Sequence, residues 1–158
     1  MLESVIVTAE RAVLAEFEEN RRIGLGHFVT RAELARQEGR RLSDVLAQIP
    51  GTSIIGGIGN RGWVSSSRGN RSLMNMPALD PVDVASGARR GRCYAQVYID
   101  RMLVYAGKSG EPLFDINSVS PDQIEAMEYY AGPAQTPLSY SVLNSACGVL
   151  VIHTRRSP

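Results

Sequence analysis

The sequence lacks any apolar run of about 18 residues, so no segment is predicted to cross a membrane as a helix. It also lacks an excess of one charge, because 17 Lys and Arg stand against 16 Asp and Glu. A net charge of +1 gives no electrostatic reason to expect a nucleic-acid partner. The N-terminus has neither a basic n-region nor a long apolar h-region. The chain is therefore expected either to be cytoplasmic or to begin after an export signal that is not included.

Cysteine and histidine are scarce, which limits the chemistry of any site. The two cysteines, Cys93 and Cys147, lie far apart and fit no metal-binding or Cys-x-x-Cys spacing. They are expected either to form one disulfide or to remain as small buried thiols. The composition of the chain does not distinguish these two states. His27 has no acidic or cysteine partner at ligand spacing. His153 lies near the end of an apolar strand, where a partly buried or edge histidine without a catalytic role is expected.

Patterns typical of enzymes are also missing. Three glycines within residues 57–62 match G-x-G-x-x-G, but the residues that follow form helices poorly, so a flexible loop is expected. No Gly-x-Ser-x-Gly elbow is present. Asp122, Glu125 and Glu128 recur at helical spacing and are expected to face solvent near a helix N-terminus. The sequence therefore predicts no enzyme, no cofactor and no metal site.

The N-terminal half predicts one strand followed by helices. Residues 4–8 are β-branched and predict a short strand, and residues 9–23 predict a helix that ends at Gly24. Thr30 opens a capping box for a helix that runs to about residue 39. Apolar residues at helical spacing over residues 42–49 predict an amphipathic helix, which ends at a Pro-Gly pair.

The middle of the chain loses this periodicity. Only a brief strand near residues 63–67 is predicted there, followed by a long irregular loop over residues 68–92. Strand alternation resumes over residues 97–105, across a tight turn at Asp100 and Arg101. With 44% hydrophobic residues and 15 glycines, the chain fits one loop-rich α+β core.

The C-terminal third predicts a capped helix, a strand, a turn and a closing strand. Ser120 is the expected N-cap of a short helix that gives way to a strand at Glu128, and a second apolar strand covers residues 149–154. Cys93 and Cys147 each precede a predicted strand. If those strands are sheet neighbours, one disulfide joins them at the same end, which an exported protein favours and a cytosolic one does not.

Six segments in this order resemble the plug domain of TonB-dependent outer-membrane receptors. Residues 3–11 resemble the TonB box and entry segment, and residues 28–34 with 42–51 resemble the first helices and their "SDVL…IPG" signature. The other matches are the "RG" box at residues 67–69, the "VxVDG" strand at residues 96–100 and "IExIEVxRGP" at residues 124–133.

Two substitutions depart from the family pattern, namely Arg101 in place of the usual glycine and Ala131 in place of the common arginine. Residues 16–28 and 147–155 look closest to plug-like domains that follow carboxypeptidase-regulatory-like modules and often lack a barrel. The resemblance implies an α+β plug-like domain with a small mixed sheet of about four strands, flanking short helices and long irregular loops. Residues 1–27 are expected to form a lead-in to a plug-like domain at residues 28–158.

The resemblance assigns roles to three groups of residues. The TonB-box-like residues are Ser4, Val5, Ile6, Val7 and Thr8, and the plug-motif residues are Arg68, Gly69, Asp100, Ile124, Glu125, Gly132 and Pro133. A contact loop is expected at Arg71, Met74, Met76, Arg89 and Arg90.

The resemblance also implies a location and two candidate functions. The first is a non-catalytic interaction module of an exported envelope protein, periplasmic or outer-membrane associated, stapled by a disulfide and bound to a protein partner. The second is the gating plug of a TonB-dependent receptor, with TonB as partner; since the sequence stops at Pro158, its barrel is expected to be missing or separately encoded. Neither reading names a ligand.

Overall fold

The computed structural model describes residues 2–56, 59–66, 77–140 and 145–155, and for residues 2–10 and 145 it describes the backbone alone. Arg68, Gly69, Arg71, Met74 and Met76 therefore lie outside the described residues. Within the described part, no helix is both long enough and apolar enough to span a bilayer.

A five-stranded sheet forms the centre of the molecule. Its strands follow the order β1-β6-β7-β4-β5, and only the β4–β7 pair is parallel. The bounds are His27–Val29 for β1, Ile124–Tyr130 for β6, Val149–Thr154 for β7, Gln96–Ile99 for β4 and Met102–Tyr105 for β5. The predicted α+β fold with a mixed sheet is confirmed, with five strands where about four were expected.

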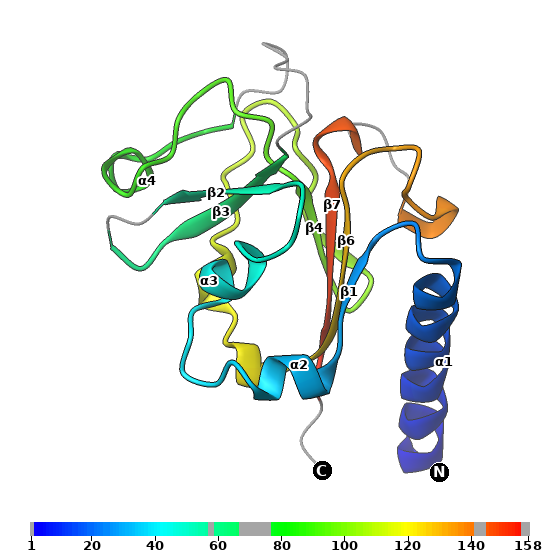
Figure 1. The fold of residues 1–158 in the computed structure, drawn as a ribbon. Coiled ribbons are helices and arrows are strands. Elements are labelled where there is room, and N and C mark those ends of the chain that lie inside the picture. The colour runs from blue at the N-terminus through cyan, green and yellow to red at the C-terminus, as the bar shows by residue number, and fades with distance from the viewer. Residues whose placement is uncertain (1, 57–58, 67–76, 141–144, 156–158) are drawn as a thin grey trace.

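Helix α1 covers one face of this sheet, and the other α-helices lie on the opposite side (Figure 1). The opposite face carries short helices and a separate antiparallel hairpin, β2–β3. The bounds are Leu2–Ile23 for α1, Arg31–Ala35 for α2, Leu42–Leu46 for α3, Thr52–Gly56 for β2, Gly62–Ser66 for β3 and Pro81–Ala85 for α4.

Strand β7 is buried on both faces, as expected for a central strand between two layers. Leu150 and Ile152 join the main core beneath α2, α3 and the hairpin. Val149 and Val151 point the other way, into a smaller tyrosine-rich cluster on the α1 side. Since alternate residues of a strand face opposite sides, His153 also lies on the α1 side.

Residues 4–8 are helical, so the predicted strand there is wrong. These residues continue α1 towards its N-terminus instead of pairing with the sheet. Helix growth is cooperative once a nucleus exists, and it satisfies the backbone N–H and C=O groups that a lone strand would leave unpaired. The β-branched composition was outweighed by the helix formers that follow.

The predicted helix after Ser120 is also mostly wrong. Ser120 does occupy the N-cap position, but only a 3-10 turn, Pro121–Gln123, follows it and no side-chain cap bond forms. Strand β6 begins at Ile124 because pairing with β1 on one side and β7 on the other satisfies its backbone. Tertiary pairing therefore overrides the local helix signal.

Other elements are shorter than predicted or were not predicted. The capping box at Thr30 and Glu33 is present, but α2 ends at Ala35 and α3 ends at Leu46. Strand β2 and helix α4 were missed, so the segment expected to be an irregular loop contains a helix with Asp80 as its N-cap. Further 3-10 turns cover Ile116–Ser118, Leu138–Tyr140 and Ser145–Cys147.

Candidate functional site: the interface between helix α1 and the sheet

One buried side chain anchors α1 to the sheet. Phe17 is only 3% exposed, whereas no other side chain in residues 11–23 is buried. Its ring packs edge-on against Phe28 of β1, at 5.9 Å between centroids, and against His153 of β7, at 6.1 Å. Residues 11–23 of α1 thus contact the sheet through a small apolar contact.

A buried carboxylate lies directly beneath this contact. Glu128 of β6 is fully buried, and its Oε2 lies 2.6 Å from Nε2 of His153 in the neighbouring strand. The hydroxyl of Tyr130 donates to Oε1 at 2.6 Å, and Nδ2 of Asn20 on α1 donates to the same oxygen at 2.9 Å. The interface therefore contains a polar network in which α1 supplies one donor.

The network keeps Glu128 ionised although it is buried. Burial by itself raises the pKa of this carboxyl, but hydrogen bonds from His153, Tyr130 and Asn20 outweigh burial and lower the pKa below its ordinary value. Burial, together with the hydrogen bond to Glu128, raises the pKa of Tyr130. The expectation that Glu128 faces solvent on a helix is wrong, because the residue lies in a paired strand between two layers.

A second contact between α1 and the rest of the protein lies at the surface. Arg101, in the β4–β5 turn, forms an ion pair with Glu16 of α1, and Ser139 donates to the same carboxylate at 3.1 Å. The predicted tight turn is confirmed, with Asp100 and Arg101 at φ of 48° and 69°. Such left-handed conformations favour glycine, so the arginine that departs from the family pattern carries some backbone strain and contacts α1.

We expect Phe17→Ala to release α1 without unfolding the sheet. The substitution removes the one buried apolar side chain of residues 11–23 and leaves the α1 contacts of Asn20 and Glu16. The Glu16 pair with Arg101 is exposed and therefore weak. Hydrogen exchange should show amide protection falling at least about tenfold in residues 11–23 and unchanged in β6 and β7. Leu14→Ala, at a more exposed position on the same helix, is the control. Equal loss of protection in helix and sheet would show that α1 is part of the global folding unit.

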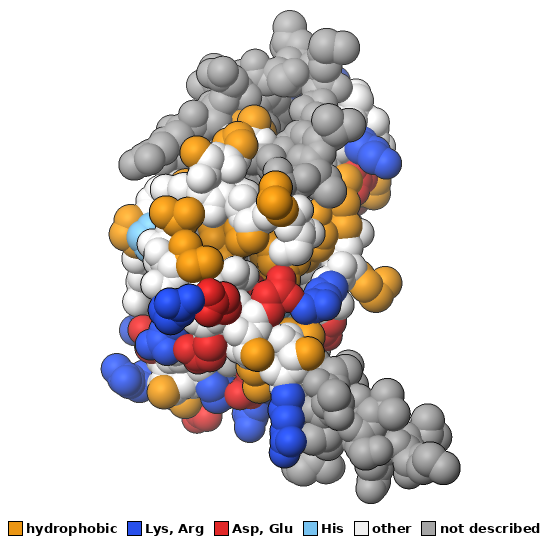
Figure 2. All heavy atoms as spheres, turned by 90° about the vertical axis from the view of Figure 1, so that its right-hand side faces the viewer, with side chains coloured by type: hydrophobic (Ala, Val, Ile, Leu, Met, Phe, Trp, Pro, Cys, Tyr) orange, Lys and Arg blue, Asp and Glu red, His pale blue; other side chains and the backbone are white. Residues whose placement is uncertain are grey.

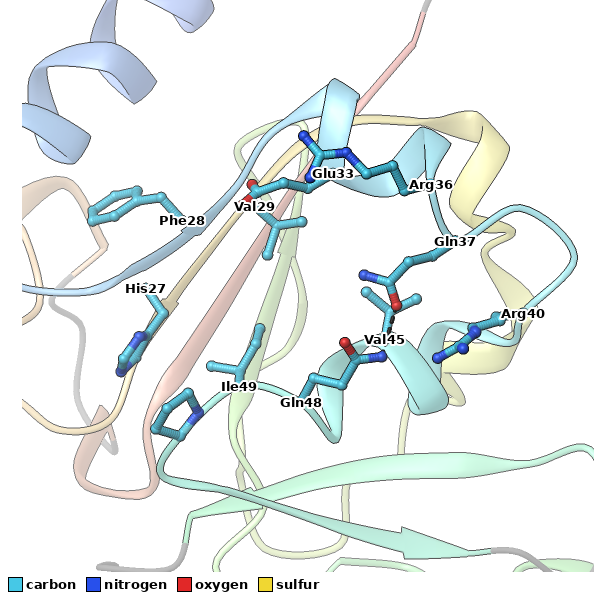
Figure 3. Close-up of a pocket in the computed structure, with 11 residues that line it drawn as sticks. His27, Phe28, Val29, Glu33, Arg36, Gln37, Arg40, Val45, Gln48 and Ile49 are labelled. Carbon is cyan, nitrogen blue, oxygen red and sulfur yellow. Dashed lines mark hydrogen bonds between the residues drawn. The ribbon is translucent and has the colours of Figure 1, made fainter.

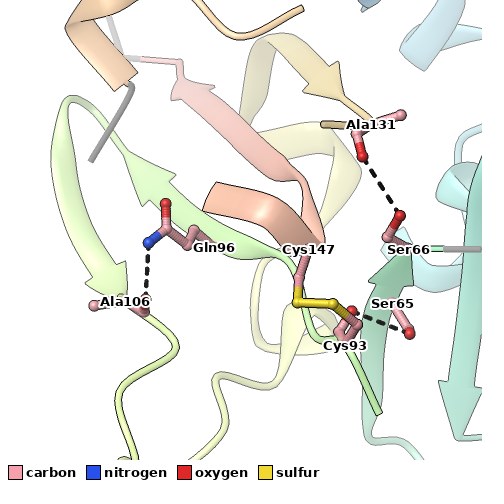
Figure 4. The surroundings of a disulfide bond; sticks show 7 residues. All are labelled: Ser65, Ser66, Cys93, Gln96, Ala106, Ala131 and Cys147. Carbon is pink, nitrogen blue, oxygen red and sulfur yellow. Dashed lines mark hydrogen bonds between the residues drawn. A yellow bond between two sulfur atoms is a disulfide. The ribbon is translucent and has the colours of Figure 1, made fainter. Parts of the chain in front are cut away.

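A disulfide between Cys93 and Cys147 joins the segments that lead into β4 and β7 (Figure 4). Cys93 precedes β4 and Cys147 precedes β7, and these strands are parallel neighbours, so the conditional prediction is confirmed. Gly148, at φ of 91°, places its backbone so close to Tyr130 that a Cβ would lie 2.9 Å from its carbonyl oxygen. Glycine is therefore required between the cysteine and β7.

Among the plug-motif residues that the structure describes, Asp100, Ile124 and Glu125 lie in or beside the strands of the sheet. Asp100 accepts a hydrogen bond from the backbone N–H of Thr154 at 2.9 Å, which ties the β4–β5 turn to β7. Ile124 is fully buried at the start of β6, and Glu125 is half-buried with its carboxylate 3.7 Å from Arg155. Gly132 and Pro133 form the turn after β6.

Arg89 and Arg90, predicted as part of a contact loop, are exposed. The backbone N–H of Arg89 donates to the hydroxyl of Tyr94 at 3.0 Å, and Tyr94 belongs to the core on the opposite face of the sheet. Ala131, where an arginine is common in the family, is buried. Gly59 and Gly62 belong to the β2–β3 hairpin, and a strand rather than a helix follows them.

The sequence did not reveal the central residues of this interface, namely Asn20, Glu128, Tyr130 and His153. A usable signal was the position of Glu128 inside an apolar run, Ile124–Tyr130, that matches a family strand. An acidic residue in such a run requires a partner, and His153 interrupts the neighbouring apolar run in the same way.

The architecture described above has known relatives. The model of the TonB-dependent receptor plug domain matches residues 27–142, more than half of the chain. No curated protein matches the chain.

Several solved structures share the fold. A mutant of the ferric enterobactin receptor PfeA from Pseudomonas aeruginosa, in complex with enterobactin, has a TM-score of 0.52 and 21% identity; the match covers 84% of this chain and 18% of the receptor chain. The siderophore receptor PirA from Acinetobacter baumannii has a TM-score of 0.51 and 20% identity, covering 84% of this chain and 17% of the receptor chain. The chain thus spans less than a fifth of these receptors, and the likeness shows the fold alone. By the family match over residues 27–142, the chain belongs to the TonB-dependent receptor plug domain family.

Proposed function

We propose that this chain is a non-catalytic plug-like module that binds another protein in the bacterial cell envelope, on the periplasmic side or at the outer membrane. Membership of the plug family supports this location. The disulfide supports it independently, because disulfides persist in oxidising compartments and are rare in the cytosol.

The observation that carries the binding role is an exposed apolar patch beside the C-terminal end of α1. Leu138 is 94% exposed, and Ile23 and Leu25 are each more than half exposed. Ile23, Leu25 and Pro137 line a shallow hollow of about 120 Å³. Figure 2 shows this face, where apolar side chains gather above a charged lower half. Apolar groups gathered on a surface in this way are typical of protein contact sites.

Site-specific photo-crosslinking in the native envelope tests this proposal. A photoreactive amino acid at Leu25 or Leu138 is expected to give one discrete adduct with another protein. The same amino acid at Lys108, an exposed polar position outside the patch, should give none. Absence of any adduct from both patch positions, with the protein exported and oxidised, would refute the binding role.

The second candidate function is gating of a TonB-dependent receptor. It is favoured by residues 4–8, which resemble a TonB box and lie in a helix that has one buried side chain, Phe17, within residues 11–23. Pairing with a TonB strand would require these residues to leave the helix and extend. Calorimetry with a TonB C-terminal domain should then detect binding that is lost when residues 1–9 are deleted. Absence of heat with the intact chain would remove the main support for gating.

Two further assignments remain proposals. We propose that residues 1–27 are a separable lead-in to the domain at residues 28–158, which the exposed surface of α1 supports. We also propose that the segment containing Arg89 and Arg90 is a contact loop, since both side chains are exposed.

A further inference from the structure

A groove of about 450 Å³ lies on the face of the sheet opposite α1 (Figure 3). It runs between strand β1 and the helices α2 and α3, with Val29, Val45 and Ile49 as its apolar lining. Gln37 and Gln48 close one side, where the amide of Gln48 donates to Oε1 of Gln37 at 2.7 Å. The groove is therefore lined by both apolar and polar side chains.

The free edge of the sheet opens into this groove. Strand β1 is the outermost strand and, among the described residues, pairs only with β6. Phe28 lines the groove although its ring points away to the α1 side, where it packs 6.0 Å from Tyr130 (Figure 3). The backbone of Phe28 must therefore line the groove. An edge strand directs alternate N–H and C=O groups outward, where an extended chain can pair with them.

The lining of the groove contains two arginines and one acidic residue, so its charge is positive. Arg36 and Arg40 line it, are exposed, and form no ion pair within the described part of the chain. Glu33 is the acidic residue of the lining, but its carboxylate accepts the backbone N–H of Thr30 at 2.7 Å and its hydroxyl at 3.0 Å. Two guanidinium groups therefore remain for an anionic partner.

We infer that this groove binds an extended acidic peptide segment of a partner protein. The segment adds a strand to β1, its apolar side chains contact Val29 and Ile49, and its carboxylates pair with Arg36 and Arg40. In strand addition, backbone hydrogen bonds provide the affinity, and contacts of alternate side chains provide the specificity. The inference names the partner class for the protein-binding role proposed above and rests on that role, but it uses a surface on the other face of the sheet.

Fluorescence anisotropy with the purified, oxidised chain tests this assignment. The probe is a labelled peptide, Thr-Val-Thr-Glu-Thr-Glu-Thr, whose valine and glutamates share one face of an extended strand. It should bind at least about tenfold more tightly than the lysine peptide Thr-Val-Thr-Lys-Thr-Lys-Thr. It should also bind more tightly than the proline peptide Thr-Val-Pro-Glu-Pro-Glu-Pro, which keeps the charge but loses backbone donors. The double variant R36Q/R40Q should weaken the first peptide about tenfold. R11Q/K108Q, which removes two positive charges at exposed positions outside the groove, should not.

Four outcomes of these experiments would contradict the inference, each in a different respect. Equal binding of the glutamate and proline peptides would overturn strand addition and leave a simple anion site. Equal effects of the two double variants would overturn the groove as the location. Self-association that competes with the peptide in sedimentation would identify a second copy as the occupant and overturn the inference. Failure of all three peptides would overturn the inference alone, since crosslinking at Leu138 tests the binding role on the other face.

Discussion

Replacing Cys93 and Cys147 together by serine is expected to lower the free energy of unfolding by about 4 kcal/mol. The bridge closes a loop with a sequence separation of 54 residues, and the unfolded chain loses entropy when its ends are joined. Because domains of this size are typically stable by about 5–15 kcal/mol, the loss is large. Urea denaturation of the variant, compared with oxidised wild type, measures it directly.

Two controls accompany the disulfide variant. Reduced wild type should unfold at nearly the same urea concentration as the double serine variant, because both lack the same cross-link. Ala146→Ser introduces a hydroxyl beside the bridge at an exposed position and should change stability by less than about 0.5 kcal/mol. If the double serine variant were as stable as oxidised wild type, the disulfide would not stabilise the fold, and this prediction would be wrong.

Glu128→Ala is expected to destabilise the fold by about 3–5 kcal/mol, because it breaks a buried charged network. It leaves the Tyr130 hydroxyl and the Asn20 amide without the acceptor that they share, and it leaves His153 without its partner. Buried polar groups without partners are costly. Glu125→Ala removes a half-buried carboxylate from the same strand and should cost under about 1 kcal/mol. Similar costs for the two variants would contradict a special role for the network.

The same network predicts how stability depends on pH. The pKa of Glu128 is lowered in the folded protein, so its contribution is complete above the ordinary pKa of about 4.3 and is lost as the pH falls through the folded value. Glu128→Gln, which keeps an acceptor but cannot ionise, should flatten the fall in stability on the acid side. Urea denaturation at several pH values between about 3 and 7 measures the slope. An unchanged slope would assign the acid sensitivity to other carboxylates.

Local patterns predicted those elements whose ends are marked by specific residues. The helix before Gly24, the capping box at Thr30 and the turn at Asp100 are correct because caps and turns depend on nearby residues. The disulfide followed from a conditional argument about neighbouring strands, and the sheet order supplied the condition. The family pattern then placed the strands in a plug-like sheet.

The failures share a physical cause, since they concern residues whose state depends on distant partners. Residues 4–8 have strand composition but lie within a helix that runs from Leu2 to Ile23. Glu128 has helical spacing to its acidic neighbours but pairs with a histidine 25 residues away. Neither spacing nor propensity along the chain encodes such contacts, so the interface of α1 with the sheet was visible only in three dimensions.

The covalent link between Cys93 and Cys147 also changes how the chain would respond to tension. Residues 94–146 contain β4, β5 and β6, and the disulfide bypasses this whole segment. A pulling force between the two ends of the chain would pass through the sulfur atoms and leave these strands outside the loaded path. Full extension would then be shorter by roughly 180 Å than for a reduced chain. Under load, the elements that could be extended are those before Cys93 and strand β7 after Cys147. Oxidation of the two cysteines therefore determines which strands a pulling force can unfold.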